Sequence, residues 1–164
     1  MSEGKSCIES KIVDALSAKQ FANKCRLLSK SIVFTNGCFD ILHYGHFKLI
    51  EQAASLGDVL IVGVNSDESV KKLKGTNRPL IPETERAYAL ASLHFVSQVV
   101  IFKEETPQML IEEIIPNVLV KGGDYTIEQV VGADFVAIHG GRVEIIPYVE
   151  GFSTSSIIEK IQTL

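Results

Sequence analysis

Five stretches of the chain are almost continuously apolar, and each is short enough to form a buried strand. Turn-forming Gly, Asn, Pro or Ser residues lie at or near their ends. Unbroken apolar runs of this length, in contrast to alternating ones, are typical of strands covered on both faces, as in parallel sheets. The five predicted strands are SIVFTNG (31–37), DVLIVGVNS (58–66), QVVIF (98–102), NVLVKGG (117–123) and RVEIIPY (142–148).

Segments with helical spacing of apolar residues separate these strands. We predict that Thr106 caps one helix, with Pro107 in its first turn. The predicted helices cover 43–57, 67–73, 83–94, 106–115 and 126–138, and a last one opens at 153–156. The alternation predicts an α/β fold with a doubly wound, five-stranded parallel sheet in the order 3-2-1-4-5, counted from 31–37. Ligands of such sheets bind beyond the carboxyl ends of the strands, where the order reverses.

The segment before the first predicted strand carries no recognisable motif. Its apolar residues Ile8, Ile12, Leu16, Phe21 and Leu28 recur at loosely helical spacing. We therefore predict one domain over 1–164, with residues 1–30 as an N-terminal helical extension. A length of 164 residues is sufficient for one substantial core.

Composition narrows the classes of function. The formal net charge of −4 argues against a general nucleic-acid binder, because such proteins need a surplus of Lys and Arg on one face. Three widely spaced cysteines form neither a disulfide framework nor a zinc pattern. The N-terminus lacks the apolar segment of a secretory signal, and the apolar runs are too short to cross a membrane. These observations predict a cytoplasmic protein without nucleic-acid or membrane partners.

Two histidines follow the first predicted strand. His43 and His46 are three residues apart, so on a helix they share one face near the first turn, where free backbone N–H groups point. Gly45 between them leaves room for an anion to approach. Zinc would need a third ligand, and neither His94 nor His139 has a partner at ligand spacing. A phosphate site is favoured over zinc and over ordinary helix-start histidines.

A basic segment follows the second predicted strand in this otherwise acidic chain. Lys71, Lys72, Lys74 and Arg78 lie at the same sheet edge as His43, so we interpret them as a clamp on phosphates. A solvated helix face is the alternative interpretation. The pattern does not decide whether Arg86 is a surface charge or braces the site.

Two further segments follow the fourth and fifth predicted strands. In VKGGDY (120–125), paired glycines permit close backbone approach, and Asp124 could bind a ribose hydroxyl or Mg²⁺. An ordinary tight turn is the alternative. The hydroxyls of residues 153–156 exceed what capping one helix requires, which suggests donors to a nucleotide. Asp40 is predicted to organise the turn before the histidines.

Together these motifs resemble the nucleotidyltransferase superfamily, whose signature HxGH is here His43-Tyr44-Gly45-His46, combined with a C-terminal STxx-type motif. The chain is most similar to the adenylyltransferase domain of heptose-1-phosphate enzymes. The resemblance runs from about residue 32 to 161 through TNGCFDILHYGH, VNSDESVKKLKG, RPLIP, TPQMLI, LVKGGDY and EGFSTSSII. It implies a Rossmann-like nucleotidyltransferase fold. The kinase half found in bifunctional relatives is absent, so a stand-alone adenylyltransferase is expected.

The resemblance also implies a role for each matching residue. The implied catalytic residues are His43, His46, Lys72 and Lys74. The implied nucleotide-binding residues are Cys38, Phe39, His43, His46, Lys121, Gly122, Asp124, Tyr125, Ser153, Thr154 and Ser155. The implied sugar-phosphate-binding residues are Asn36, Lys74, Arg78 and Arg86. No protein ligand to a metal is implied, and Mg²⁺ is expected to be held mainly by the phosphates of ATP.

The implied reaction joins AMP from Mg-ATP to D-glycero-D-manno-heptose 1-phosphate, giving ADP-heptose for lipopolysaccharide core synthesis and releasing pyrophosphate. The implied partners are ATP and heptose 1-phosphate, with a homodimer as the implied assembly. Alternatives are a glycerol-3-phosphate cytidylyltransferase, an FMN adenylyltransferase or a nucleotide sensor without turnover.

Overall fold

The structure is a computed structural model that describes residues 6–164, and its centre is one parallel β-sheet. All five predicted strands are present, and every neighbouring pair in the sheet is parallel. Their long apolar runs are buried because helices cover both faces. These strands are β2 (Ile32–Gly37), β3 (Val59–Asn65), β4 (Gln98–Phe102), β5 (Val118–Gly122) and β6 (Arg142–Ile146).

The predicted strand number and order need a correction. The sheet has six strands in the order β1-β4-β3-β2-β5-β6 rather than five in the order 3-2-1-4-5. The additional strand, β1 (Ile12–Val13), pairs with Val99 and Val100 at the edge of the sheet. The other five keep their predicted relative order. A two-residue strand shows no recognisable periodicity, and its partner lies far along the chain, so the sequence pattern could not reveal it.

The N-terminal extension is therefore not wholly helical. It contains the 3-10 turn η1 (Glu9–Lys11), then β1, then the helix α1 (Ala15–Leu27). The part of that prediction that falls on residues 1–5 lies outside the described residues. Asp14 caps α1 by accepting a hydrogen bond from the backbone N–H of Ser17 at 2.7 Å.

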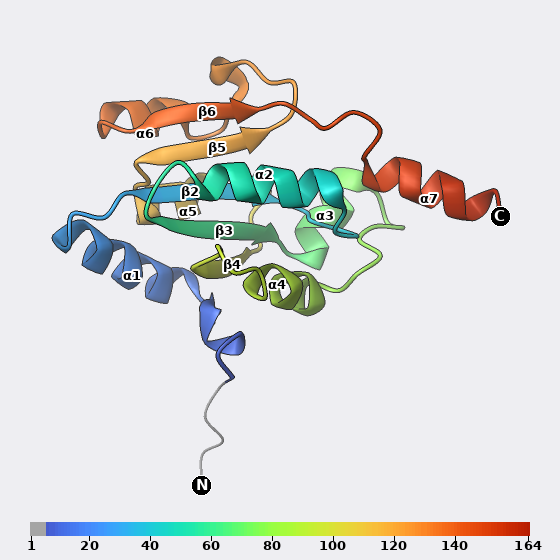
Figure 1. Cartoon of the computed structure of the whole chain (residues 1–164), viewed down its shortest axis with the longest axis horizontal. Coiled ribbons are helices and arrows are strands. Elements are labelled where there is room, and N and C mark those ends of the chain that lie inside the picture. Colours follow the sequence, from blue (N-terminus) through green and yellow to red (C-terminus); the bar gives the residue numbers. More distant parts are fainter. Residues whose placement is uncertain (1–5) are drawn as a thin grey trace, which may run out of the picture.

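Helices cover both faces of the sheet (Figure 1). One core contains buried residues of α1, α5 and α6 against Phe34, Ile61 and Val100 of the strands. The opposite core contains buried residues of α2 and α4 against Val33, Val62 and other strand residues. These helices are α2 (Tyr44–Ala54), α4 (Glu83–Ala91), α5 (Gln108–Ile114) and α6 (Ala133–Ile138).

Several predicted helix boundaries differ from the observed ones. Pro107, not Thr106, is the N-cap of α5, and α4 ends at Ala91 rather than His94. The predicted helix over 126–138 is divided into a 3-10 turn, η2 (Ile127–Gln129), and α6. Gly132 separates them with φ of +87°, and a Cβ there would lie 2.8 Å from Ile111. The close packing on α5 explains why the chain turns at this glycine.

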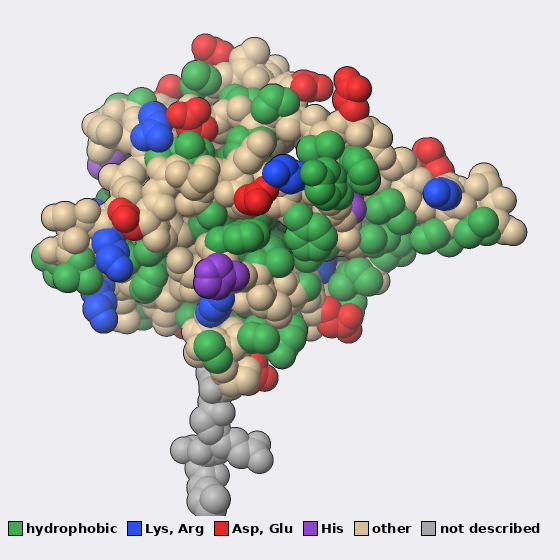
Figure 2. Space-filling view, viewed as in Figure 1, with side chains coloured by type: hydrophobic (Ala, Val, Ile, Leu, Met, Phe, Trp, Pro, Cys, Tyr) green, Lys and Arg blue, Asp and Glu red, His purple; other side chains and the backbone are tan. Residues whose placement is uncertain are grey.

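The carboxyl ends of the strands define the functional edge. In Figure 1 the arrowheads of β3, β5 and β6 point to the side that carries α3 (Asp67–Lys74) and α7 (Thr154–Gln162). The order of the sheet reverses between β2 and β5, which are hydrogen-bonded neighbours. Helix α7 projects beyond the sheet, and Figure 2 shows hydrophobic side chains along it. A ligand site is therefore expected between β2, β5 and α7.

The same space-filling view shows Lys, Arg, Asp and Glu side chains interspersed on this face rather than gathered by sign (Figure 2). Within residues 6–164, no helix is both long and apolar enough to cross a bilayer.

Candidate active site

The turn after β2 brings the functional segments together. Phe39 and Ile41 adopt φ values of 50° and 55°, which are uncommon for residues with a Cβ, so other contacts must hold this turn. The buried ring of Phe39 meets the His46 ring edge-on, with centroids 5.4 Å apart. The turn thus forms the floor beneath the second histidine.

Asp40 holds the turn in place. Its buried carboxylate accepts hydrogen bonds from Arg78 Nε at 2.6 Å and from the backbone N–H groups of Leu80 and Ile81 at 2.9 Å. Burial by itself raises the pKa of Asp40, but these hydrogen bonds and the Arg78 charge outweigh it and lower the pKa. Its backbone carbonyl accepts a hydrogen bond from Thr154 Oγ1 at 2.8 Å. One residue therefore ties the loop after α3 and the start of α7 to the β2–α2 turn, as its predicted role requires.

His43 and His46 lie against each other at the start of α2. Their rings are stacked with centroids 3.9 Å apart, and both Nδ1 atoms are buried without a hydrogen-bond partner among residues 6–164. Burial lowers the pKa of both, and for His46 burial, His43 and Lys74 together lower it to about 4. A Cβ on Gly45 would lie 3.2 Å from His43 Nδ1, so glycine allows this packing. The pair is therefore neutral at pH 7.

The four hydroxyl side chains at the start of α7 have different roles. Ser153 is the N-cap and accepts from the Ser156 N–H at 3.0 Å, while Ser156 Oγ donates to the Ser153 carbonyl at 2.8 Å. Thr154 is bonded to Asp40. Ser155 lines the adjacent pocket, and no described residue hydrogen-bonds its hydroxyl. Capping and anchoring therefore account for three of the four hydroxyls, which leaves Ser155 and the helix N-terminus for a ligand.

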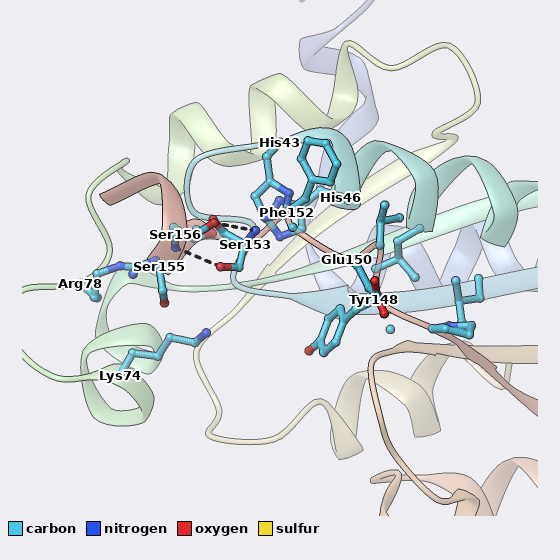
Figure 3. Close-up of a pocket in the computed structure, with 18 residues that line it drawn as sticks. His43, His46, Lys74, Arg78, Tyr148, Glu150, Phe152, Ser153, Ser155 and Ser156 are labelled. Atoms are coloured by element: carbon cyan, nitrogen blue, oxygen red, sulfur yellow. Dashed lines mark hydrogen bonds between the residues drawn. The ribbon is translucent and has the colours of Figure 1, made fainter. Parts of the chain in front are cut away.

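The first of two neighbouring pockets lies between these elements and has a volume of about 550 Å³. Figure 3 shows His43, His46 and Phe152 on one side, with Lys74 extending from α3 toward the space in front of Tyr148. The segment 146–152, which connects β6 to α7, supplies much of its wall. Tyr44 and Phe152 pack with ring centroids 5.1 Å apart and join this segment to α2.

The second pocket has a volume of about 510 Å³ and adjoins the first. Asn36, Cys38, Phe39, Lys121 and Tyr125 line the second pocket only. Residues that line both pockets are His46, Leu49, Lys74, Arg78, Gly122, Tyr148 and Thr154. The site is therefore a double pocket with a cationic boundary formed by Lys74 and Arg78.

Three predicted site residues line neither pocket. Lys72 is exposed and pairs with Glu68 at 3.0 Å, one helical turn away. Arg86 is buried, and its guanidinium donates to the carbonyls of Ile81 and Cys38 and to the Asp67 carboxylate. Asp124 is exposed beside the glycine turn. The structure thus places Arg86 as a brace behind the turn after β2 and does not bring it to the sugar-phosphate position predicted for it.

Comparison with known proteins identifies the family. The sequence model of the cytidylyltransferase-like family matches residues 34–160, which include both histidines, the lysines and the start of α7. The chain belongs to the cytidylyltransferase-like family. This confirms the predicted membership of the nucleotidyltransferase superfamily.

Relatives of this cytidylyltransferase-like chain are named bifunctional protein HldE. The one from Geotalea uraniireducens is 58% identical over 153 residues, which cover 93% of this chain and 31% of the relative. The one from Koribacter versatilis is 51% identical over 152 residues, covering 93% and 31%. The chain spans about a third of the length of these curated relatives.

Solved structures share the fold. A lipopolysaccharide core biosynthesis protein from Thermoplasma volcanium matches with a TM-score of 0.60 and 26% identity, over 73% of this chain and 97% of that one. Pantoate-beta-alanine ligase from Francisella tularensis, in complex with beta-gamma ATP and beta-alanine, matches with a TM-score of 0.63. At 18% identity, over 93% of this chain and 78% of the ligase chain, the second likeness shows the fold alone.

Sequence reasoning missed several lining residues of this cytidylyltransferase-like site. Asn65 ends β3 at the second pocket, and Asn36 lies one residue before the end of β2, so the rule of strand carboxyl ends could have found Asn65. Tyr148 lies outside every motif named above, and Phe152 lies within EGFSTSSII but was assigned no role. Tyr148 packs so closely on the glycine turn that a Cβ on Gly123 would lie 2.8 Å from its ring, a contact that only the fold reveals.

Proposed function

We propose that this chain transfers AMP from Mg-ATP to a heptose 1-phosphate, giving ADP-heptose and pyrophosphate. The observation that carries the proposal is the double pocket, because a transfer between two substrates needs two adjoining volumes with shared charged groups at their boundary. The bifunctional HldE relatives support the heptose substrate, and the core biosynthesis relative supports the pathway. The proposal treats the chain as a single nucleotidyltransferase domain.

ATP fits the first pocket best. The N-terminus of α7 and the stacked histidines, which line this pocket, provide polar groups for phosphates. The aromatic residues Tyr148 and Phe152 and the backbone of 146–151 provide a wall for the base. A neutral histidine can donate one hydrogen bond without the cost of burying a charge. We therefore assign the triphosphate to the α7 side and the nucleoside to the 146–152 segment.

The chemistry needs alignment more than a strong base. A phosphate oxygen of the acceptor attacks the α-phosphorus of ATP, the bond to the β-phosphate breaks, and pyrophosphate leaves with its electron pair. Lys74 lines both pockets, so its ammonium can neutralise charge on the attacking oxygen of the acceptor and on the leaving oxygen of pyrophosphate. His43, His46 and the helix terminus hold the phosphates that depart.

Magnesium is expected to enter with ATP. Among residues 6–164, no three His, Cys, Asp or Glu side chains form a metal-binding group, and Glu150 is the carboxylate that lines the first pocket. Phosphate oxygens, with at most Glu150 in addition, are the hard ligands that Mg²⁺ prefers. The ion would neutralise the triphosphate while the protein supplies alignment.

Pyrophosphate release tests the proposal. The purified protein with Mg²⁺ is given ATP or CTP, each crossed with both anomers of heptose 1-phosphate, glycerol 3-phosphate and FMN. Release with ATP and one heptose phosphate alone supports the proposal. Pyrophosphate release only with another combination of nucleotide and acceptor would show that the substrate assignment is wrong and that the transfer chemistry is right.

We expect His46→Ala to lower turnover by two or more orders of magnitude while the circular dichroism spectrum stays unchanged. Loss of a preorganised donor at a transferring phosphate typically costs about 10²–10³ in rate. Near-normal turnover of this variant would remove the histidines from the mechanism. Arg142→Ala, on the exposed part of β6, is the matched control.

A cytidylyltransferase is the second candidate, since the matched family carries that description. CTP in the same experiment distinguishes the two. Preference for CTP with glycerol 3-phosphate would favour a cytidylyltransferase.

A further inference from the structure

A lysine at the end of β5 lacks an anionic partner. Lys121 forms no ion pair or hydrogen bond with any described residue, and its ammonium lies 5.4 Å from the centre of the Tyr125 ring. Burial, and to a lesser extent Lys74, lower the pKa of Lys121, while Cys38 acts in the opposite direction. A partly desolvated ammonium without a counter-charge is costly, so the arrangement is stabilised when an anion binds.

The surroundings of Lys121 favour an anion. Three cations, Lys74, Arg78 and Lys121, line the second pocket. Of the two carboxylates there, Asp40 is already neutralised by Arg78, and Glu105 is exposed and makes no ion pair with Lys121. The second pocket therefore keeps a local positive charge, although the net charge of the chain is −4.

The position of Lys121 distinguishes the second pocket from the first. It lines the second pocket and not the first, which contains His43 and the serines at the start of α7. The second pocket also contains the amide side chains of Asn36, Asn65 and Gln129, which can donate to and accept from hydroxyls, beside apolar residues such as Val130 and Val131. The cations and amides of this lining match a ligand with one phosphate and several hydroxyl groups.

We propose that Lys121, together with Lys74, binds the phosphate of the acceptor substrate, so that Lys121 serves the acceptor and not the nucleotide. This inference rests on the proposed function, because it assumes that a sugar phosphate is the second substrate. Lys74, which lines both pockets, then holds the acceptor phosphate against the α-phosphorus of ATP. The amide residues recognise the hydroxyl groups of the sugar.

Binding measurements test this assignment without turnover. The protein is saturated with α,β-methylene-ATP, which cannot transfer AMP, and heptose 1-phosphate, glycerol 3-phosphate and inorganic phosphate are each titrated in by calorimetry. The variants are Lys121→Met, Lys121→Arg and, as matched control, Lys103→Met. Lys103 follows β4 as an exposed lysine that lines neither pocket.

We expect Lys121→Met to weaken binding of the sugar phosphate about tenfold to a hundredfold, the usual worth of a hydrogen bond to a charged group. Affinity for the ATP analogue should stay within about twofold, and Lys121→Arg should recover part of the loss. In turnover, the KM of the acceptor should rise while the KM of ATP does not. Lys103→Met should match the original protein in each measurement.

Other outcomes overturn the inference or the proposed function separately. If Lys121→Met weakens binding of the ATP analogue and leaves sugar-phosphate binding unchanged, Lys121 binds the nucleotide and not the acceptor. If no phosphate compound binds the analogue-saturated protein, the second pocket is not an acceptor phosphate site. If glycerol 3-phosphate binds through Lys121 while heptose 1-phosphate does not, the inference stands and the heptose substrate fails.

Discussion

Burial determines the charge of the two histidines at this site. His46 lies between the Phe39 ring and the His43 ring, with Lys74 nearby, so burial and positive neighbours disfavour its protonated form and outweigh the opposite effect of Asp40. Its pKa of about 4 keeps the imidazole neutral throughout the physiological range. The sequence predicted a histidine pair facing a phosphate, but its protonation state follows from packing that the spacing of residues does not contain.

The lowered pKa of His46 predicts a pH dependence of stability. An unfolded histidine titrates near 6.5 and the folded one near 4, so between these values the unfolded chain binds more protons. The contribution of neutral, buried His46 to the stability of the folded state is therefore present above about pH 6.5 and is lost as the pH falls toward 4. We expect His46→Gln to reduce the acid-induced loss of stability by at most about 3 kcal/mol. Urea unfolding of both proteins at pH 7 and pH 4.5 measures this loss of stability. An equal loss in the original protein and the variant would contradict the prediction.

Arg86 is the largest of the fully buried side chains. Its donors hold the carbonyls of Cys38 and Ile81 and the carboxylate of Asp67, so it joins α4 to the turn after β2 and to α3. We expect Arg86→Met to lower the free energy of unfolding by about 3 kcal/mol or more, since the acceptors lose their partner. Urea denaturation measures this. Arg142→Met, which breaks an exposed pair with Glu144, should cost less than about 1 kcal/mol; equal effects would show that Arg86 is not a brace.

At the scale of elements, α7 depends on few contacts. None of its residues is fully buried, and it projects beyond the sheet (Figure 1). The hydrogen bond from Thr154 to the Asp40 carbonyl connects its first turn to the β2–α2 turn, more than a hundred residues away in sequence. The first pocket is formed partly by this helix start, so its shape depends on the connection.

We expect Thr154→Val to loosen α7, because valine keeps the shape of threonine and removes the hydroxyl. The net cost should be about 1 kcal/mol, with faster amide hydrogen exchange over residues 154–162 and a higher KM for ATP. Thr163→Val, which removes a hydrogen bond to the Lys160 carbonyl at the other end of the helix, is the control. Unchanged exchange in the Thr154 variant would show that α7 is held by other contacts.

The elements also show where pattern reading fails. Apolar periodicity continues across residues 126–138, but Gly132 interrupts the helix because it packs against Ile111 of another helix. Similarly, Lys72 and Lys74 were both assigned to the site. Residues two apart point to nearly opposite sides of a helix, and the structure turns Lys74 to the pockets and Lys72 to Glu68.

At the scale of the whole molecule, α1 completes one face of the sheet. Ala18, Ala22 and Cys25 belong to the same core as Phe34, Ile61 and Ile111, and Arg26 donates to the carbonyl of Ile114 at 2.7 Å. The segment that carries no chemical motif therefore has a structural task.

We expect a chain that begins at residue 30 to lose cooperative thermal unfolding and to bind a hydrophobic dye, because a large apolar area becomes exposed. Calorimetry and dye fluorescence measure this. Lys19→Ala, which removes only the exposed ion pair with Glu113, should change stability by less than about 1 kcal/mol. A truncated chain that melts like the full one would show that α1 is dispensable.

The sequence by itself determined the parallel sheet, five of its six strands, and the segments that carry the chemistry. Those features depend on local signals: apolar runs, helix caps, and the rule that ligands bind at strand ends. Only the tertiary structure decided that β1 joins the sheet, that Arg86 is buried, that two pockets exist, and that Lys121 lines the second. These outcomes depend on how elements far apart in the chain pack together, and the physical reason is that packing, not spacing, fixes which side chain is desolvated and which faces a ligand.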